Sequence, residues 1–215
     1  LYAIGFAYFA LVLLGDVWQS IGRDLPEWFD SPRLAQGVAV ATTLGLAVHL
    51  VRKAEGGGQW VNAGKVFVFG ILILAGLWAV MRQPAAHTLT ALTPFFSGGS
   101  SGLIQAMGYT FIALQGFDLI AAVGGEVRDP ARTLPRAMIG SLGIALAIYL
   151  PLLFVIATVG VPQGGNIQAA AADAPEEIVA IAAQHYLGAF GYWLVIVAAV
   201  LSMFSALQAN LFAAS

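Results

Sequence analysis

Residues 140–160 read GSLGIALAIYLPLLFVIATVG and are the clearest indication of the fold class of this chain. This stretch carries no charged residue and is apolar on every face of a helix, which is typical of a helix embedded in lipid. A spanning helix needs about 20 mostly apolar residues, whereas membrane β-strands alternate apolar and polar residues over about 10 positions. Because the stretch is long and does not alternate, we predict a membrane-spanning helix over 137–160, with a kink at Pro151.

Other long apolar runs without alternating polar residues raise the number of predicted spanning helices to about six. We therefore expect an all-α protein, a polytopic membrane helix bundle, with residues 1–215 forming a single transmembrane domain. The chain starts inside one apolar run without a methionine and stops directly after another, so we expect it to be part of a longer membrane protein. The other predicted spans cover residues 1–20, 34–52, 60–81, 102–125 and 188–213.

The composition excludes several classes of protein. Of the 215 residues, 60% are hydrophobic and 9% are charged, against about 25% charged in soluble domains. A net charge of −2 argues against a nucleic-acid partner, and the absence of cysteine excludes thiolate metal sites. The three histidines are scattered, and the sequence contains no nucleophile elbow or phosphate loop, so we expect neither an enzyme nor a bound metal or cofactor.

The charges in the loops predict the orientation. Basic residues gather around the loops near 53–59 and 126–136, whereas the loop over about 161–187 has acidic residues and no lysine or arginine. The positive-inside rule then places the two basic loops in the cytoplasm and the protein in the cytoplasmic membrane. Within the acidic loop, a short amphipathic helix between Pro175 and Gly188 is expected over the extracellular face, either as a passive cap or with a function.

Two charged residues lie well inside predicted spans. Asp118 lies seven residues before the expected exit of its span near Gly125, and Lys65 lies six residues after the entry near Gln59. At 1.5 Å per residue both are about 10 Å deep, which makes them functional candidates and possible partners. The alternatives are a snorkelling lysine and a helix-packing hydrogen bond from Asp118. Asp16, His49 and Arg82 lie near span ends, where snorkelling explains them.

The span over 102–125 is rich in glycine, and Gln115 and Gly116 fall at its middle. Glycine weakens a helix, and a broken helix at the midplane is how many secondary transporters build a substrate site. The alternative is close helix packing through small residues. The last span carries several polar side chains, among them Ser205, which either join helices or line a substrate or ion site.

The stretch FIALQGFDLIAAVGGEVRDPARTLPRAM, residues 111–138, resembles the sixth transmembrane helix and following loop of amino acid permeases, members of the amino acid–polyamine–organocation (APC) superfamily. Their pattern is approximately F-x-A-x-x-G-F-D, two Glu, and a turn like D-P-x-R-x-x-P-R-A. QWVNAGKVFVF, residues 59–69, resembles the start of their fifth helix, and LSMFSALQANLFAAS, residues 201–215, resembles their eighth. The resemblance covers essentially the whole chain, which would supply helices three to eight of about twelve.

This resemblance implies a leucine-transporter-type fold with a 5+5 inverted repeat, and a site completed by helices of the parent chain that lie outside these residues. Lys65 matches a lysine that replaces a sodium ion in proton-coupled members, Asp118 matches a gating or lysine-pairing aspartate, and Ser205 is a weaker substrate candidate. The implied substrate-binding segment of helix six consists of Phe111, Ile112, Ala113, Leu114, Gln115 and Gly116.

The chain departs from the family pattern at three positions. Gly125 stands where the first of two glutamates is usual, Gln115 replaces a hydrophobic or acidic residue, and Gln208 replaces an asparagine. The implied function is a secondary active transporter that moves amino acids or related amines across the lipid bilayer, coupled to protons through Lys65. The alternatives are an amino acid or polyamine exchanger, and a membrane sensor or channel on the same fold.

Overall fold

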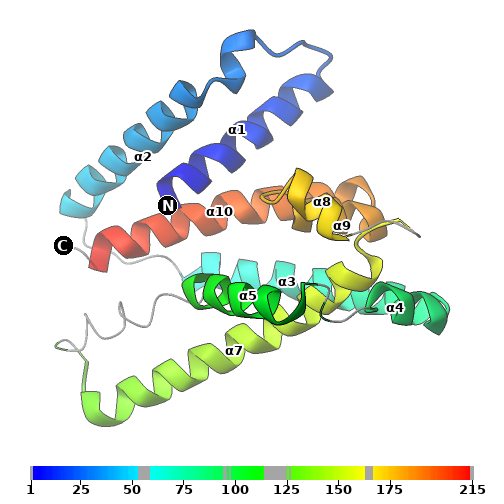
Figure 1. Ribbon diagram of the computed structural model, residues 1–215. Helices are drawn as coiled ribbons and strands as arrows, with labels where there is room; N and C mark the ends of the chain where they lie inside the picture. The colour runs from blue at the N-terminus through cyan, green and yellow to red at the C-terminus, as the bar shows by residue number, and fades with distance from the viewer. Residues whose placement is uncertain are drawn as a thin grey trace. The chain divides into compact units, whose positions relative to one another are not determined.

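The computed structural model describes residues 2–52, 59–93, 96, 98–113, 125, 127–162 and 167–213, and the regular elements among them are helices (Figure 1). These helices gather into two compact units. The first unit comprises Leu1–Val68 and Ala189–Ser215, and the second comprises Phe69–Gly188. Each unit has its own packed interior, and each is described by itself below.

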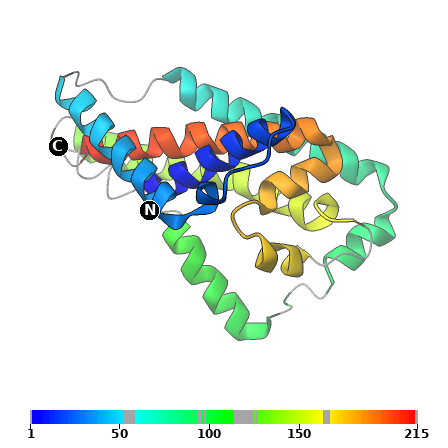
Figure 2. The same ribbon diagram turned by 90° about the horizontal axis from the view of Figure 1, so that it is seen from above.

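In the first unit, α1 (Tyr2–Ser20) packs against both α2 (Pro32–Arg52) and α10 (Ala189–Ala213), as Figures 1 and 2 show. The short 3-10 helix η1 (Glu27–Asp30) joins α1 to α2. Ala7 and Ile196 are fully buried, and the rings of Phe6 and Phe204 lie 5.6 Å apart across the α1–α10 contact. Residues brought together from the two ends of the chain therefore form this interior.

The second unit is organised around α7 (Pro130–Val159), which packs against α9 (Ile178–Leu187) and α4 (Ala85–Ala91). It also contains α5 (Gly99–Ala113), α8 (Ile167–Asp173) and the later part of α3 (Gln59–Arg82). α9 presents buried alanines, Ala180, Ala182 and Ala183, to its neighbours. Small side chains at such positions let helices approach closely.

Gly76 of α3 lies against Val155 of α7. A Cβ atom at this position would overlap the side chain of Val155, which is fully buried. Gly70, which precedes Gly76 on the same helix, has open space where a Cβ atom would lie. The tight fit at Gly76 is therefore a local requirement of packing against α7, and glycine is the residue that meets it.

Within the described residues, the helices α1, α2, α3, α7 and α10 are long and apolar enough to cross a membrane. They correspond to the predicted spans 1–20, 34–52, 60–81, 137–160 and 188–213. α5 covers the first part of the predicted span 102–125, whose residues 114–124 lie outside the described part of the chain. Many large apolar side chains are exposed on these helices, including Leu74, Ile104 and Leu153, as expected for surfaces that face lipid.

The start of α7 differs from the prediction. The sequence suggested a loop up to residue 136, but the helix begins at Pro130 and includes Pro135. Proline suits the first helical position because its missing N–H has no acceptor there, and Asp129 precedes it with φ of 50°, a left-handed conformation that aspartate tolerates. Pro135 leaves the carbonyl of Ala131 without its helical donor, and Ala131 is exposed.

The loop helix expected between Pro175 and Gly188 is present as α9. Gly188 follows it with φ of 67°, which glycine adopts without the steric cost of a Cβ. The short helices α4 and α8 were not predicted from the sequence. Each has seven residues, too few to produce a clear helical periodicity.

Candidate functional site

Two residues that the sequence singled out separately meet in the first unit. The ammonium group of Lys65 donates a hydrogen bond to Oγ of Ser205 at 2.9 Å. Lys65 lies in the second turn of α3 and Ser205 in the second half of α10, and both side chains are half-buried. The sequence suggested Asp118 rather than Ser205 as the partner of the lysine.

The chemistry of this pair follows from its donors and acceptors. An ammonium group has three N–H donors and no acceptor, whereas a serine hydroxyl both donates and accepts. Ser205 is a neutral partner, so it satisfies one donor of Lys65 without cancelling its charge. A charged group inside a membrane protein needs hydrogen-bonding partners or a path to water. Within the described residues, Ser205 takes one donor of Lys65, which leaves two for further acceptors such as a carboxylate or backbone carbonyls.

The predicted substrate-binding segment is described only in part. Phe111, Ile112 and Ala113 form the last turn of α5, and the Phe111 side chain is 75% exposed. The side chains of Ile112 and Ala113 are not described. Leu114, Gln115 and Gly116, and also Asp118, lie outside the described residues. The roles assigned to these residues, and the pairing of Lys65 with Asp118, remain predictions.

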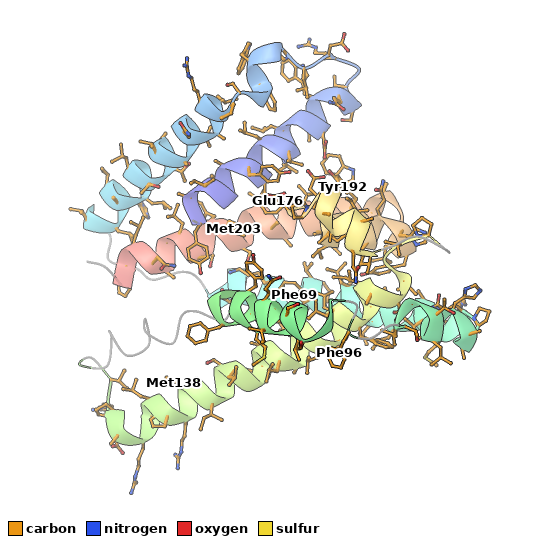
Figure 3. All side chains as sticks on the ribbon, viewed as in Figure 1. Phe69, Phe96, Met138, Glu176, Tyr192 and Met203 are labelled. Atoms are coloured by element: carbon orange, nitrogen blue, oxygen red, sulfur yellow. The ribbon has the colours of Figure 1, made fainter. Side chains whose placement is uncertain are left out.

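A second polar contact in the first unit was missed from the sequence. The hydroxyl group of Tyr192, labelled in Figure 3, donates a hydrogen bond to Oδ2 of Asp16 at 2.8 Å. This bond links α1 to the first turn of α10. The signal in the sequence was a lone acid near a span end, which was explained by snorkelling. A lone carboxylate near the end of a span is better interpreted as a group that needs a hydrogen-bond donor, and Tyr192 of α10 supplies it.

We expect Tyr192→Phe to lower the free energy of unfolding by about 1–2 kcal/mol, because the variant removes a hydrogen bond to a carboxylate and keeps the ring. Thermal unfolding of the purified protein in lipid nanodiscs would measure the change. Tyr2→Phe, on the same helix as Asp16, is the control for losing a hydroxyl group elsewhere in this unit. Equal stability of Tyr192→Phe and the unaltered protein would contradict a stabilising role for the α1–α10 bond.

The helices and the lysine–serine pair define a multi-pass membrane protein with a charged group held inside a spanning segment. The sequence profile of the family described as amino acid permease matches residues 1–215. The chain therefore belongs to the amino acid permease family of the APC superfamily, a transporter family rather than an enzyme family. Membership implies the leucine-transporter-type fold that the motifs suggested.

Curated relatives agree with this assignment. The chain is 32% identical over 150 residues to the inner membrane transport protein YbaT of Escherichia coli, a match covering 69% of this chain and 32% of that protein. It is 31% identical over 146 residues to the serine/threonine exchanger SteT of Bacillus subtilis, and 29% identical over 149 residues to the probable threonine/serine transporter YbxG of the same species. Those two matches cover 66% and 65% of this chain, and 32% of each relative. The matched region thus spans about a third of these relatives.

Proposed function

We propose that the complete protein is a secondary active transporter that carries amino acids or related amines across the cytoplasmic membrane and is driven by protons. Family membership supports the class of transporter. The hydrogen bond from Lys65 to Ser205 is the observation that carries the proposal of proton coupling, since it holds an ionisable group inside a spanning helix.

The proposed coupling uses the direction of this hydrogen bond. A protonated Lys65 can only donate to Ser205, whereas a neutral amine can also accept a hydrogen bond from the serine hydroxyl. Loss of the proton would thus free the hydroxyl group to reorient and would weaken the link between α3 and α10. We propose that Asp118 competes with Ser205 for the ammonium group, and that residues 111–116 contact the substrate. Helices supplied by the rest of the parent chain complete the site.

The proposed topology places the loops near 53–59 and 126–136 in the cytoplasm, because basic loops are retained on that side. It puts residues 1–215 in one transport domain, with the loop that contains α8 and α9 outside the cell. Cysteine scanning would test this, since the chain has no cysteine of its own. A single cysteine at Arg128 should react with a membrane-impermeant maleimide only after the cells are opened, whereas one at Gln184 on α9 should react in intact cells.

Exchange of one substrate for another is the second candidate function, because the relative SteT is a serine/threonine exchanger. Uptake by the complete protein in proteoliposomes distinguishes the two. Vesicles would receive an inward pH gradient without sodium and a panel of labelled amino acids and polyamines, and a parallel set would be preloaded with unlabelled substrate.

Accumulation that a protonophore abolishes supports proton-driven uptake and identifies the substrate. Uptake confined to preloaded vesicles supports exchange and makes Lys65 a fixed structural cation. A folded protein that moves no compound in either format would contradict both functions and favour a sensor.

A further inference from the structure

The second unit contains a cavity of about 440 Å³ between α3, α4, the end of α7 and α9. Its polar lining consists of Gln83, His87, Thr90, Thr158, His185 and Tyr186. The proposed transport mechanism uses none of these residues. A volume of this size lies within the range of about 300–1,000 Å³ that is usual for small-molecule sites.

The hydrogen atoms of the lining hydroxyl groups are already committed to the backbone. Thr90 donates to the carbonyl of Ala86 at 2.8 Å, and Thr158 donates to the carbonyl of Phe154 at 2.7 Å. Each hydroxyl group has a single hydrogen atom, so neither can donate to a ligand without giving up its bond. What each offers to the cavity is the acceptor capacity of the two lone pairs on its oxygen atom.

Tyr186 and His185, both from α9, also use a hydrogen atom in a bond to a backbone carbonyl. The hydroxyl group of Tyr186 donates to the carbonyl of Leu72 at 3.3 Å, and burial raises the pKa of Tyr186 to about 12, which keeps that hydrogen in place at neutral pH. Nδ1 of His185 lies 3.1 Å from the carbonyl of Val159. A carbonyl only accepts, so Nδ1 carries a hydrogen, and Nε2 is an acceptor when the ring is uncharged.

The side chains of Gln83 and His87 add acceptors to the cavity and also supply its few available donors. Nε2 of Gln83 donates to the hydroxyl group of Thr88 at 3.1 Å, which leaves its carbonyl oxygen as an acceptor and one N–H as a donor. His87, on α4, offers one donor and one acceptor when neutral. Acceptors therefore outnumber donors around the cavity. Among the described residues, its lining contains no lysine, arginine, aspartate or glutamate, and Arg82, which precedes Gln83 in the chain, is held over the ring of Trp78 at 4.9 Å.

We infer that this cavity binds the ammonium group of a small primary amine, a ligand that donates several hydrogen bonds and accepts none. An anion would find few donors and, in the part of the lining that the structure describes, no fixed positive charge. An ammonium group would find lone pairs from Gln83, which follows α3, and from α4, α7 and α9, with the ring of Tyr186 beside them. The cavity is large enough for an alkyl chain as well, so it fits an organic amine better than a bare sodium ion.

Calorimetric titration of the complete protein in lipid nanodiscs tests this inference, with n-butylammonium as the probe. n-Butyltrimethylammonium has the same charge but no N–H donor, so it should bind at least about tenfold more weakly. Sodium chloride at equal concentration should not compete. Equal binding of the two amines would overturn the inference, because charge alone would then explain the binding, and competition by sodium would overturn it in favour of a metal-ion site.

Substitutions locate the bound probe. Thr90→Val should weaken n-butylammonium binding about tenfold, since it removes one acceptor for a charged donor. Thr93→Val is its matched control, because Thr93 is also exposed and donates to a carbonyl four residues earlier but does not line the cavity. Thr158→Val should behave like Thr90→Val, whereas Thr158→Ser keeps the acceptor and should bind normally.

Unchanged binding in both Thr90→Val and Thr158→Val would place the probe elsewhere and contradict the inference. This site does not depend on the proposed transport function. The uptake assay in proteoliposomes measures transport whether or not the cavity binds an amine. A protein that transports substrate but does not bind the probe at these residues would contradict the cavity site alone and leave the transport function standing.

Discussion

Replacing Lys65 with alanine should reduce proton-driven accumulation of substrate by about 10- to 100-fold. The variant removes the ionisable group that donates to Ser205 at 2.9 Å, and a gradient of about one to two pH units sustains about 10- to 100-fold accumulation per proton carried, since each 1.4 kcal/mol is tenfold. If Lys65 carries the proton, its loss removes the coupling as well, so the steady-state level should fall to equilibration across the membrane. Uptake in proteoliposomes with an imposed pH gradient measures this directly.

Further variants and an exchange assay distinguish a loss of proton coupling from a loss of folding. Ser205→Ala should lower accumulation less than Lys65→Ala, because the lysine keeps its charge and can find another acceptor. Ser202→Ala, one turn earlier on α10, is the matched control and should transport normally. Lys65→Ala protein should still exchange substrate in preloaded vesicles, which shows that it is folded. Undiminished proton-driven accumulation by Lys65→Ala would contradict the proposed role.

Replacing Gly76 with valine should prevent stable folding of the second unit. Even one Cβ at this position would overlap the fully buried side chain of Val155, and overpacking a rigid interior costs about 1–3 kcal/mol or more. We expect Gly76→Ala to lose about that much and Gly76→Val to exceed it. Thermal unfolding monitored by size-exclusion chromatography in detergent measures both variants.

Two further variants give this prediction its controls. Gly70→Ala lies on the same helix with open space around its Cβ, and it should be neutral or slightly stabilising because alanine favours helix. Val155→Ala should partly rescue Gly76→Ala by making room for the added methyl group, although it destabilises the unaltered protein through the cavity it leaves. A stable Gly76→Val protein, or the absence of any rescue, would contradict the described contact between α3 and α7.

The helical class and most spans were predictable because spanning a bilayer leaves a strong pattern of about 20 apolar residues. The start of α7 was not. Prolines at 130 and 135 suggested a loop, and the sequence did not reveal that Pro130 occupies the first helical position and that Ala131 is exposed. The position of a helix end depends on which backbone groups can be hydrogen-bonded by water, and the spacing of apolar residues does not indicate this.

The members of the candidate site were predictable one at a time, and their pairing was not. Lys65 stood out as a charge within a span, and Ser205 as one of several polar residues in the last span. They are 140 residues apart in the chain, so only the packing of α3 and α10 brings them together. The same holds for Asp16 and Tyr192, which are 176 residues apart. Spacing along a helix predicts neighbours within that helix and not between helices.

If substrate and protons cross the membrane together, adding substrate must itself move protons. Proteoliposomes containing the complete protein and a trapped pH-sensitive dye would be given substrate on the outside, at symmetric pH with the membrane potential clamped. We predict acidification of the lumen at a rate proportional to the uptake of labelled substrate, and its loss in Lys65→Ala. Substrate uptake at an undiminished rate without any change in lumenal pH would contradict proton coupling.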